Sequence, residues 1–368
     1  MRIGWLIYGD LNTRTGGFLY DREIVRRLQA WGHQVQVVSL PWRRAWAAAL
    51  GSLWVRDGRG LPWDAWDVVV EDGLVHPSLS LRPPRTTTPR VALLHLPRMY
   101  TVSGGLTQWA ARWLEARYLQ RVQGLVAVCR ANLAWARSQG FRGPAVVAYP
   151  AGDHLHPDVT EGQVVQRALR EGPLQVLFVG QVVPRKGLHV LVEALTRLPR
   201  GSWRLTVVGD DRWHPAYARR VRAGLRRRGL ESAVTWLGPQ PPEGVARAMR
   251  RAQVLAVPSR AEGYAVVYVE AMGFGLPVIG SRVGGGPELI RPGENGYLAG
   301  PERVDEVATA LRALLEPSHR ARLSRAALRT YREHPTWDDA ARIFETFLQT
   351  FVGPYTNEPG PGPQERSR

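Results

Sequence analysis

Cysteine and long hydrophobic runs are nearly absent from this chain of 368 residues. A single cysteine, Cys129, excludes a disulfide within the chain and is typical of a reducing compartment. The longest nearly uninterrupted apolar stretch, residues 45–55, is far shorter than the roughly 20 residues that span a bilayer. No basic and apolar leader precedes the first strand-like segment. These absences predict a cytoplasmic protein that is neither secreted nor embedded in a membrane.

Lysine is equally scarce, because only one of the 49 Lys and Arg residues is a lysine, Lys186. The formal net charge of +17 raises the alternative of a nucleic-acid-binding protein. However, +8 of this charge falls on residues 1–168 and +9 on residues 169–368, and no RNA- or DNA-binding motif is present. We therefore expect no nucleic-acid partner. In a chain that otherwise uses arginine, Lys186 marks a position that favours a compact ammonium group over a planar guanidinium.

Motifs for a metal ion are also missing. The D-x-D triad does not occur, since Asp210–Asp211 and Asp338–Asp339 are adjacent pairs. His154 and His156 lie two residues apart, but no Cys or further His follows at a spacing that would complete a metal site. We therefore predict no metal and no other cofactor, and we interpret these two histidines as part of a linker.

What the sequence does contain is a repeated alternation of short apolar runs with amphipathic segments, typical of parallel, doubly wound α/β sheets. The alternation is interrupted at residues 150–173, which contain Gly, Pro and His, and then restarts. A chain of this length is expected to form two cores. We predict two Rossmann-like domains that face a central cleft, residues 1–168 and 169–335. A helix over residues 336–352 should pack back on the first domain, and residues 353–368 should be disordered.

The predicted strands indicate where a ligand would bind. In open α/β sheets, ligands bind at the carboxyl ends of the strands, so functional motifs should follow strands directly. Strands are predicted over residues 2–8, 34–40, 66–71, 90–95, 124–129 and 145–149, and then over residues 174–179, 203–208, 234–237, 254–257 and 277–280.

The most informative segment, residues 258–277, follows a predicted buried strand. Glu262 and Gly263 fall in a turn, and residues 264–272 have helical character, so the first N–H groups of the helix would favour an anion in the cleft. Glu270 lies eight residues after Glu262, about 12 Å away at about 1.5 Å per helical residue. The two carboxylates can therefore contact opposite ends of an extended ligand. The alternative is two surface glutamates near a helix N-terminus, where acidic residues are stabilising in any case.

The context of these glutamates resembles the E-x7-E signature of glycosyltransferase family 4, whose members have the GT-B fold and retain the configuration of the transferred sugar. From Glu262 onward the chain reads EGYAVVYVEAMGFGLPVI. Residues 180–187 (GQVVPRKG) are similar to the family's strand–loop element, and residues 284–288 (GGGPE) to its GGxPE turn. Residues 150–153 (PAGD) resemble its hinge-proximal PNGxD, and Gly16–Gly17 its first glycine loop.

The resemblance implies a nucleotide-sugar donor and assigns roles to individual residues. Glu262 would contact the transferred sugar and Glu270 the ribose. His95 matches the histidine that follows a strand in the family's first domain and would contact sugar or acceptor; the alternative is a histidine satisfied at a strand end. Further donor-binding residues are Gly16, Gly17, Gly180, Gly263, Tyr264, Ala265 and Val266. Departures from the family pattern are Tyr264 for Phe, Ala265 for Gly and Ala151 for Asn.

Arg185 and Lys186 precede a predicted helix, for which Pro184 is a suitable first residue. Two cations and the N–H groups of a helix terminus would converge there, which suits a diphosphate. In a retaining transfer these cations would stabilise the charge that develops on the leaving diphosphate. Arg185, Lys186, Glu262 and His95 are therefore the predicted catalytic residues.

The predicted function is that of a retaining, metal-independent glycosyltransferase. It would transfer a hexosyl group from a UDP- or GDP-linked donor to a hydroxyl of a lipid-linked, polysaccharide or small polar acceptor. A nucleotide-sugar 2-epimerase of the same fold is the alternative. Residues 41–56 combine Trp, Arg and small apolar residues and could bind an anionic membrane surface, placing the protein on the inner face of the membrane. The alternative for this segment is an ordinary amphipathic helix that covers the sheet.

Overall fold

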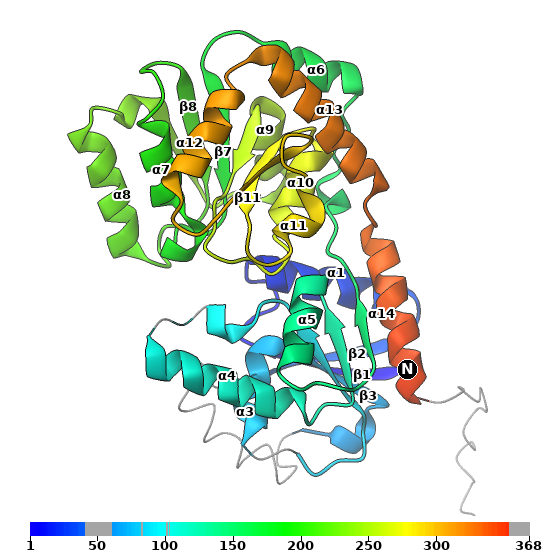
Figure 1. The fold of residues 1–368 in the computed structure, drawn as a ribbon. Helices are drawn as coiled ribbons and strands as arrows, with labels where there is room; N and C mark the ends of the chain where they lie inside the picture. Colours follow the sequence, from blue (N-terminus) through cyan, green and yellow to red (C-terminus); the bar gives the residue numbers. More distant parts are fainter. Residues whose placement is uncertain (41–60, 82–83, 101, 103, 353–368) are drawn as a thin grey trace, which may run out of the picture.

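The computed structural model describes residues 1–40, 61–81, 84–100, 102 and 104–352. These residues form two α/β domains, each built on a six-stranded sheet in which every pair of neighbouring strands is parallel. Figure 1 shows the two domains stacked, with the domain that begins the chain below the other. The predicted pair of doubly wound domains is thus confirmed. The predicted membrane segment, residues 41–56, and the predicted disordered tail, residues 353–368, lie outside the described residues.

The first sheet has the order β2-β1-β3-β4-β5-β6. Its strands are β1 (Arg2–Tyr8), β2 (Gln34–Leu40), β3 (Val68–Asp72), β4 (Arg90–Leu94), β5 (Gly124–Ala127) and β6 (Ala145–Val147). The described helices of this domain are α1 (Gly16–Ala30), α3 (His76–Ser80), α4 (Gly105–Leu119) and α5 (Arg130–Ser138), with 3-10 turns η1 (Trp63–Ala65), η2 (Gly73–Val75) and η3 (Arg98–Tyr100). Every residue of β3 and β4 is buried, as expected for a parallel sheet covered on both faces.

The second sheet has the order β12-β11-β10-β7-β8-β9. Its strands are β7 (Leu174–Val179), β8 (Trp203–Val208), β9 (Val234–Gly238), β10 (Val254–Ala256), β11 (Val278–Ser281) and β12 (Gly296–Ala299). The helices are η5 (Pro184–Lys186), α7 (Leu188–Leu195), α8 (Pro215–Arg227), η6 (Glu231–Ala233), α9 (Pro242–Arg251), α10 (Val266–Gly273), α11 (Gly286–Leu289), α12 (Val304–Ala313) and α13 (Pro317–Glu333). The edge strand β12 has no counterpart among the predicted strands, because it is short and only half of its residues are buried.

The segment between the sheets contains the 3-10 turn η4 (Asp153–Leu155) and helix α6 (Glu161–Leu169). Helix α6 contacts α13, and its Arg167 donates hydrogen bonds to the carbonyls of Phe274 and Gly275. Val164, on the same helix, is fully buried. Helix α6 therefore packs with the second domain, and the predicted boundary at residues 168 and 169 is corrected to a position before this helix.

Helix α14 (Trp337–Val352) returns to the first domain, where it contacts α1, β3 and β6. Figure 1 shows it beside the N-terminus of the chain. Trp337, Phe344 and Leu348 are fully buried there, and Phe344 stacks on Trp5 of β1 with 5.3 Å between ring centroids. The helix thus completes the core of the first domain. Within the described residues, no helix has both the length and the apolar character needed to cross a membrane.

Candidate active site

A cavity of about 720 Å³ lies between the two domains, where strands of both sheets end. Every residue that the sequence singles out as catalytic or donor-binding lines this cavity. The first domain contributes Gly16, Gly17 and His95; the second contributes Gly180, Arg185, Lys186, Glu262, Gly263, Tyr264, Ala265, Val266 and Glu270. The two domains therefore bring together residues that lie far apart in the chain.

Glu262 is the centre of a buried charged group in the second domain. One of its carboxylate oxygens, Oε1, accepts hydrogen bonds from Lys186 Nζ at 2.6 Å and from Ser259 Oγ at 2.5 Å. The other oxygen, Oε2, lies 3.4 Å from Arg185 Nη1. Burial disfavours the charged carboxylate, but the two cations outweigh it and lower the pKa of Glu262 to about 2. For Lys186, burial lowers the pKa, and the ion pair with Glu262 offsets part of that effect.

The turn that carries the two cations is fixed by close contacts with its neighbours. Arg185 accepts a hydrogen bond from the backbone N–H of Arg260 on its carbonyl and donates one to the carbonyl of Ala261. Gly187 has φ of +73°, and a Cβ atom there would lie 2.2 Å from the carbonyl oxygen of Pro258. Only glycine fits this position. The loops after β7 and β10 are therefore held against each other, which keeps both cations at Glu262.

Helix α10 begins at Val266, two residues later than predicted. The preceding residue, Ala265, has φ of +60° and ψ of +73°, a left-handed conformation that is unfavourable for a residue with a Cβ atom. In the family pattern this position is a glycine, which adopts the left-handed conformation at a lower cost than alanine does. The turn ends in a helix whose Glu270 is 8% exposed and faces the cavity.

The two domains touch each other at one edge of the cavity. A Cβ atom at Gly263 would lie 1.8 Å from the carbonyl oxygen of His95, so the two loops approach as closely as a glycine permits. Cys129 Sγ lies 3.3 Å from the Gly263 carbonyl, and burial raises the pKa of this thiol to about 12. Glu288 of the second domain accepts hydrogen bonds from the N–H groups of Arg130 and Ala131 in the first turn of α5. The structure therefore shows the domains in contact around the cavity.

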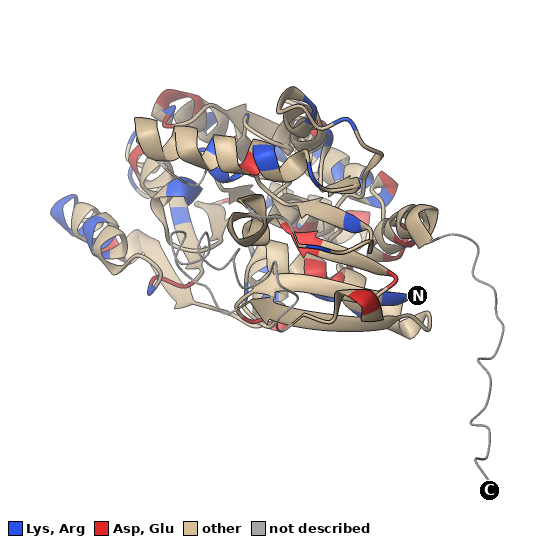
Figure 2. Cartoon of the chain, turned by 90° about the horizontal axis from the view of Figure 1, so that it is seen from below, with Lys and Arg blue, Asp and Glu red and all other residues tan. Residues whose placement is uncertain are grey.

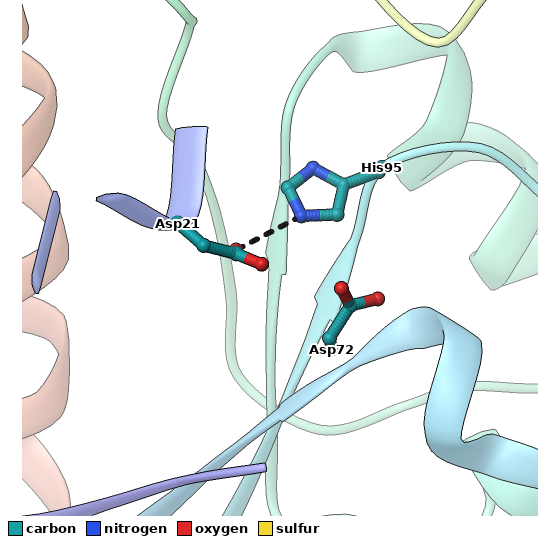
Figure 3. Close-up of side chains that lie close together, drawn as sticks. All are labelled: Asp21, Asp72 and His95. Carbon is teal, nitrogen blue, oxygen red and sulfur yellow. Dashed lines mark hydrogen bonds and ion pairs between the residues drawn. The ribbon is translucent and has the colours of Figure 1, made fainter. Parts of the chain in front are cut away.

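His95 is held by two buried aspartates of the first domain (Figure 3). Its Nε2 lies 3.1 Å from Oδ1 of Asp21 on α1, and Asp72, at the end of β3, lies beside this pair. Burial and the charge of Asp21 raise the pKa of Asp72 to about 7. Burial disfavours the cationic form of His95, but the charge and hydrogen bond of Asp21 outweigh it and raise the pKa of the ring. Its other nitrogen, Nδ1, points away from both carboxylates.

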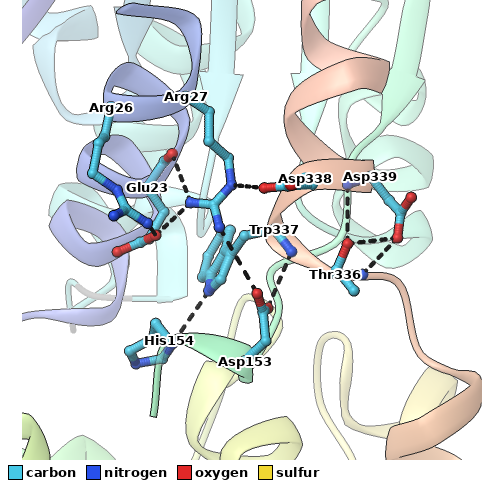
Figure 4. Close-up of polar contacts among 9 residues, drawn as sticks. All are labelled: Glu23, Arg26, Arg27, Asp153, His154, Thr336, Trp337, Asp338 and Asp339. Carbon is cyan, nitrogen blue, oxygen red and sulfur yellow. Dashed lines mark hydrogen bonds and ion pairs between the residues drawn. The ribbon is translucent and has the colours of Figure 1, made fainter. Parts of the chain in front are cut away.

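His154, interpreted from the sequence as part of a linker, lies in the cavity wall. Its Nε2 is 3.1 Å from Oε1 of Glu270, and its Nδ1 is 3.2 Å from the indole nitrogen of Trp337 on α14. Figure 4 shows this contact together with Asp153, which accepts a hydrogen bond from the backbone N–H of Trp337. His154 thus lies in the segment that connects the two sheets, as predicted, and the turn η4 places it between the two domains.

The described part of the chain contains one group of side chains whose ligand atoms lie within 4.8 Å of one another and could hold a metal ion: Asp21, Asp72 and His95. The hydrogen bond from His95 to Asp21 already occupies one ligand atom of each. Burial and the nearby charge of Asp21 favour the protonated form of Asp72, which reduces the repulsion between the two carboxyl groups.

Both a family model and individual proteins of known function are similar in sequence to this chain. Residues 160–330 match the family described as Glycosyl transferases group 1. This segment of the chain is therefore similar to group 1 glycosyltransferases. The chain is 34% identical over 200 residues to D-inositol 3-phosphate glycosyltransferase of Rhodococcus erythropolis, covering 52% of this chain and 45% of that protein. It is 37% identical over 191 residues to the protein of the same name from Nocardia farcinica, covering 50% and 41%. The chain thus spans less than half of the length of these relatives.

Solved structures resemble both domains of this chain together. Sucrose-phosphate synthase of Thermosynechococcus elongatus superposes with a TM-score of 0.79 at 20% identity, over 95% of this chain and 99% of that chain. Alr3699/HepE of Anabaena in complex with UDP-glucose gives a TM-score of 0.72 at 20% identity, with the same coverages. The arrangement of the two domains is therefore the GT-B fold, as predicted.

Sequence reasoning missed four residues in or beside the cavity: Asp21, Asp72, His154 and Trp337. They lie on α1, β3, η4 and α14. His154 offered the one usable signal, since it follows the hinge motif directly at residues 150–153. A search for metal-ligand spacing could not reveal it, because its partners are a glutamate and a tryptophan far along the chain.

Proposed function

We propose that this protein is a retaining glycosyltransferase that transfers a hexosyl group from a UDP- or GDP-linked sugar to an acceptor hydroxyl. The observation that carries the proposal is the buried group of Glu262, Lys186 and Arg185 in the wall of a cavity between two GT-B domains. The match to group 1 glycosyltransferases supports it, as does the similar fold of Alr3699/HepE in complex with UDP-glucose.

In this proposal Lys186 and Arg185 contact the donor diphosphate. Without a donor, Glu262 is the carboxylate that faces both cations, so the group holds two positive charges and one negative charge. A diphosphate would supply the missing negative charge, and the same cations would stabilise the leaving group as the bond to the sugar breaks. Glu262 would then contact the transferred sugar and Glu270 the ribose. Gly16 and Gly17 allow the first domain to approach the donor closely.

The direct test combines donor binding with turnover. A thermal-shift panel of nucleotide sugars should identify the donor, since a bound ligand raises the unfolding temperature by mass action. With that donor, Glu262→Gln and Lys186→Ala should each lose at least about 100-fold in turnover while the protein stays folded. Glu294→Gln and Arg291→Ala are the matched controls, because these residues form an exposed ion pair and do not line the cavity. Full activity of either cavity variant would refute the assignment of the site.

The epimerase alternative has no support from the relatives named above, which are transferases. Release of free nucleotide only in the presence of an acceptor would separate transfer from epimerisation. We also propose that transfer needs no metal and no other cofactor. Turnover should then survive treatment with EDTA, and a loss that Mg²⁺ or Mn²⁺ restores would contradict metal independence.

We propose that the acceptor is a hydroxyl of a lipid-linked, polysaccharide or small polar compound. We also propose that the protein is cytoplasmic and binds peripherally to an anionic membrane. The predicted contact at residues 41–56 is not described by the structure, but helix α4 of the same domain adds support. Leu106, Trp109 and Trp113 follow helical spacing and are 85%, 65% and 45% exposed. Arg117 lies over the Trp113 ring, so a basic group accompanies the apolar face. Exposed Trp and Leu beside arginines are typical of a helix that contacts anionic lipid.

Vesicle binding tests this contact. The protein should co-sediment at low salt with phosphatidylglycerol vesicles and not with phosphatidylcholine vesicles. The double change Trp109→Ser and Trp113→Ser should reduce binding, whereas Leu169→Ser, an exposed position on the second domain, should not. Failure of the unchanged protein to bind anionic vesicles would exclude membrane association.

A further inference from the structure

His154 connects Glu270 to the helix that completes the first domain. Its Nε2 lies 3.1 Å from Glu270 Oε1, and the side chains of both residues are nearly buried, at 11% and 10% exposure. On the opposite side of the ring, Nδ1 lies 3.2 Å from Nε1 of Trp337, a residue with no exposed surface. One imidazole therefore contacts a group in each domain.

The Trp337 contact determines which ring nitrogen carries the proton. An indole nitrogen can only donate a hydrogen bond, so Nδ1 of His154 must accept it and cannot carry a proton itself. The proton of the neutral ring then sits on Nε2, which donates to the carboxylate of Glu270. Tautomers of histidine are set in this way by the partner of the second nitrogen.

We propose that His154 is a positioning residue for Glu270, and that it orients this carboxylate toward the ribose hydroxyls of the donor nucleotide. The inference rests on the proposed function, because it takes Glu270 as the ribose contact. His154 occupies one oxygen of Glu270, which leaves the other oxygen to accept hydrogen bonds from a ligand. A glutamate held in one orientation loses less side-chain entropy on binding than a free one.

The surroundings hold His154 in place through contacts from both domains (Figure 4). Trp337 packs edge to face on Tyr20 of α1, with 5.5 Å between ring centroids. Its backbone N–H donates to Asp153, the residue before His154, at 3.1 Å. Arg27 of α1 pairs with both sides of this contact. Its Nη2 lies 3.8 Å from Oδ2 of Asp153, and its Nε lies 2.5 Å from Oδ1 of Asp338, the residue after Trp337. The position of Glu270 thus depends on how the first domain and α14 meet the turn η4.

The charged groups around His154 favour its protonation, and Trp337 opposes it. Burial disfavours the imidazolium, but the hydrogen bond and charge of Glu270, with smaller effects of Glu23 and Asp153, raise the pKa of the ring. Arg27 and Asp338 complete the charged groups at this position and pair with each other. A doubly protonated ring has no lone pair for the indole N–H, so Trp337→Phe should allow His154 to protonate at higher pH. A cationic His154 would hold Glu270 more tightly and compete with the ribose.

The test uses the full-length protein with UDP and GDP as probes, together with the 2′,3′-dideoxy form of whichever binds. The unchanged protein should bind the ribose form more tightly than the dideoxy form. In His154→Leu, the affinity for the ribose form should fall about tenfold and this discrimination should disappear, whereas kcat at saturating donor should change less than about threefold. His154→Gln, whose amide nitrogen can replace Nε2, should restore the affinity to within about threefold.

Two further variants and two contrasting outcomes complete the test. His319→Leu, on α13 and outside the cavity, should leave both affinities unchanged. In Trp337→Phe, the loss of affinity for the ribose form on acidification should begin at a higher pH than in the unchanged protein. Equal discrimination in His154→Leu and the unchanged protein would overturn the positioning role alone. If the unchanged protein binds neither UDP nor GDP, the proposed function fails, and the role of His154 fails with it.

Discussion

Two carboxyl groups, one in each domain beside the cavity, are buried to nearly the same degree, but their pKa values are shifted in opposite directions. Glu262 of the second domain is 5% exposed and Asp72 of the first is 1% exposed. The pKa of Glu262 is about 2, whereas the pKa of Asp72 is about 7. Burial raises the pKa of both, so the neighbours decide the outcome: Lys186 and Arg185 face Glu262, whereas another aspartate, Asp21, faces Asp72.

The comparison shows how the two halves of the cavity are suited to different tasks. In the second domain, the group around Glu262 holds two positive charges and one negative charge and therefore suits an anion. In the first domain, two carboxyl groups and one imidazole lie close together, and the pKa values of Asp72 and His95 are both raised. Protonation of Asp72 would leave the carboxylate of Asp21 to pair with His95. The Glu262 group and the His95 group thus lie on the second-domain and the first-domain side of the cavity.

The largest expected effect comes from changing the shape of the cation in the second domain. Lys186→Arg keeps the charge but replaces a compact ammonium, 2.6 Å from Glu262, with a larger planar group in a side-chain site that is 15% exposed. We expect turnover to fall on the order of 100-fold, with donor binding measured by the thermal shift retained in part. Normal turnover would mean that the lone lysine reflects composition and that any cation serves at this position.

An intermediate effect is expected in the first domain, where the two aspartates should differ. Asp21→Asn removes the negative charge that supports His95, and we expect turnover to fall about tenfold or more. Asp72→Asn imitates the protonated aspartate and should retain turnover within about threefold near pH 6. Steady-state kinetics between pH 5 and pH 9 would measure both. The opposite order of effects would show that Asp72, and not Asp21, is the charged partner of His95.

The smallest effect concerns stability, for which the two halves should respond to pH with opposite sign. The folded state binds a proton at Asp72 more tightly than the unfolded chain does, so its contribution is present below about pH 4 and is lost as the pH rises through about 7. Glu262 has the reverse behaviour, because its pKa is lowered, and its contribution is lost as the pH falls from about 4.5 to about 2.

Urea unfolding at pH 5 and pH 8 measures the first of these contributions. The unchanged protein should lose on the order of 2 kcal/mol more than Asp72→Asn between these two values. Below pH 4, Glu262→Gln should show a weaker loss of stability than the unchanged protein. Identical pH profiles for the unchanged protein and Asp72→Asn would mean that this carboxyl group has an ordinary pKa in the folded state.

The residues of the second half were predictable because they follow strands in short motifs. Lys186 lies seven residues after the predicted end of β7, and Glu262 and Glu270 have a fixed spacing within one turn and helix. The alternating apolar runs likewise predicted the two parallel sheets. Helix α10 was placed two residues too early, because helical periodicity does not reveal that Ala265 adopts a left-handed conformation.

The partners in the first half could not be predicted in the same way. Asp21 and Asp72 belong to an ordinary helix and an ordinary strand, and their proximity to His95 results from packing of α1 against the sheet. The contact of His154 with Trp337 joins residues that are 183 positions apart. Nothing in the local sequence indicates such contacts, since each depends on how complete elements pack. The sequence predicted His95 as a site residue, but it did not reveal the two aspartates that control the charge of its ring.

Helix α14 carries a consequence for how the protein is made. The core of the first domain includes Trp337 and Phe344, which the ribosome adds only after the whole second domain has been synthesised. Until then Trp5 of β1 lacks the aromatic ring that stacks on it. The first domain to emerge is therefore the last to be completed, and the nascent chain must keep an apolar surface protected while the second domain folds.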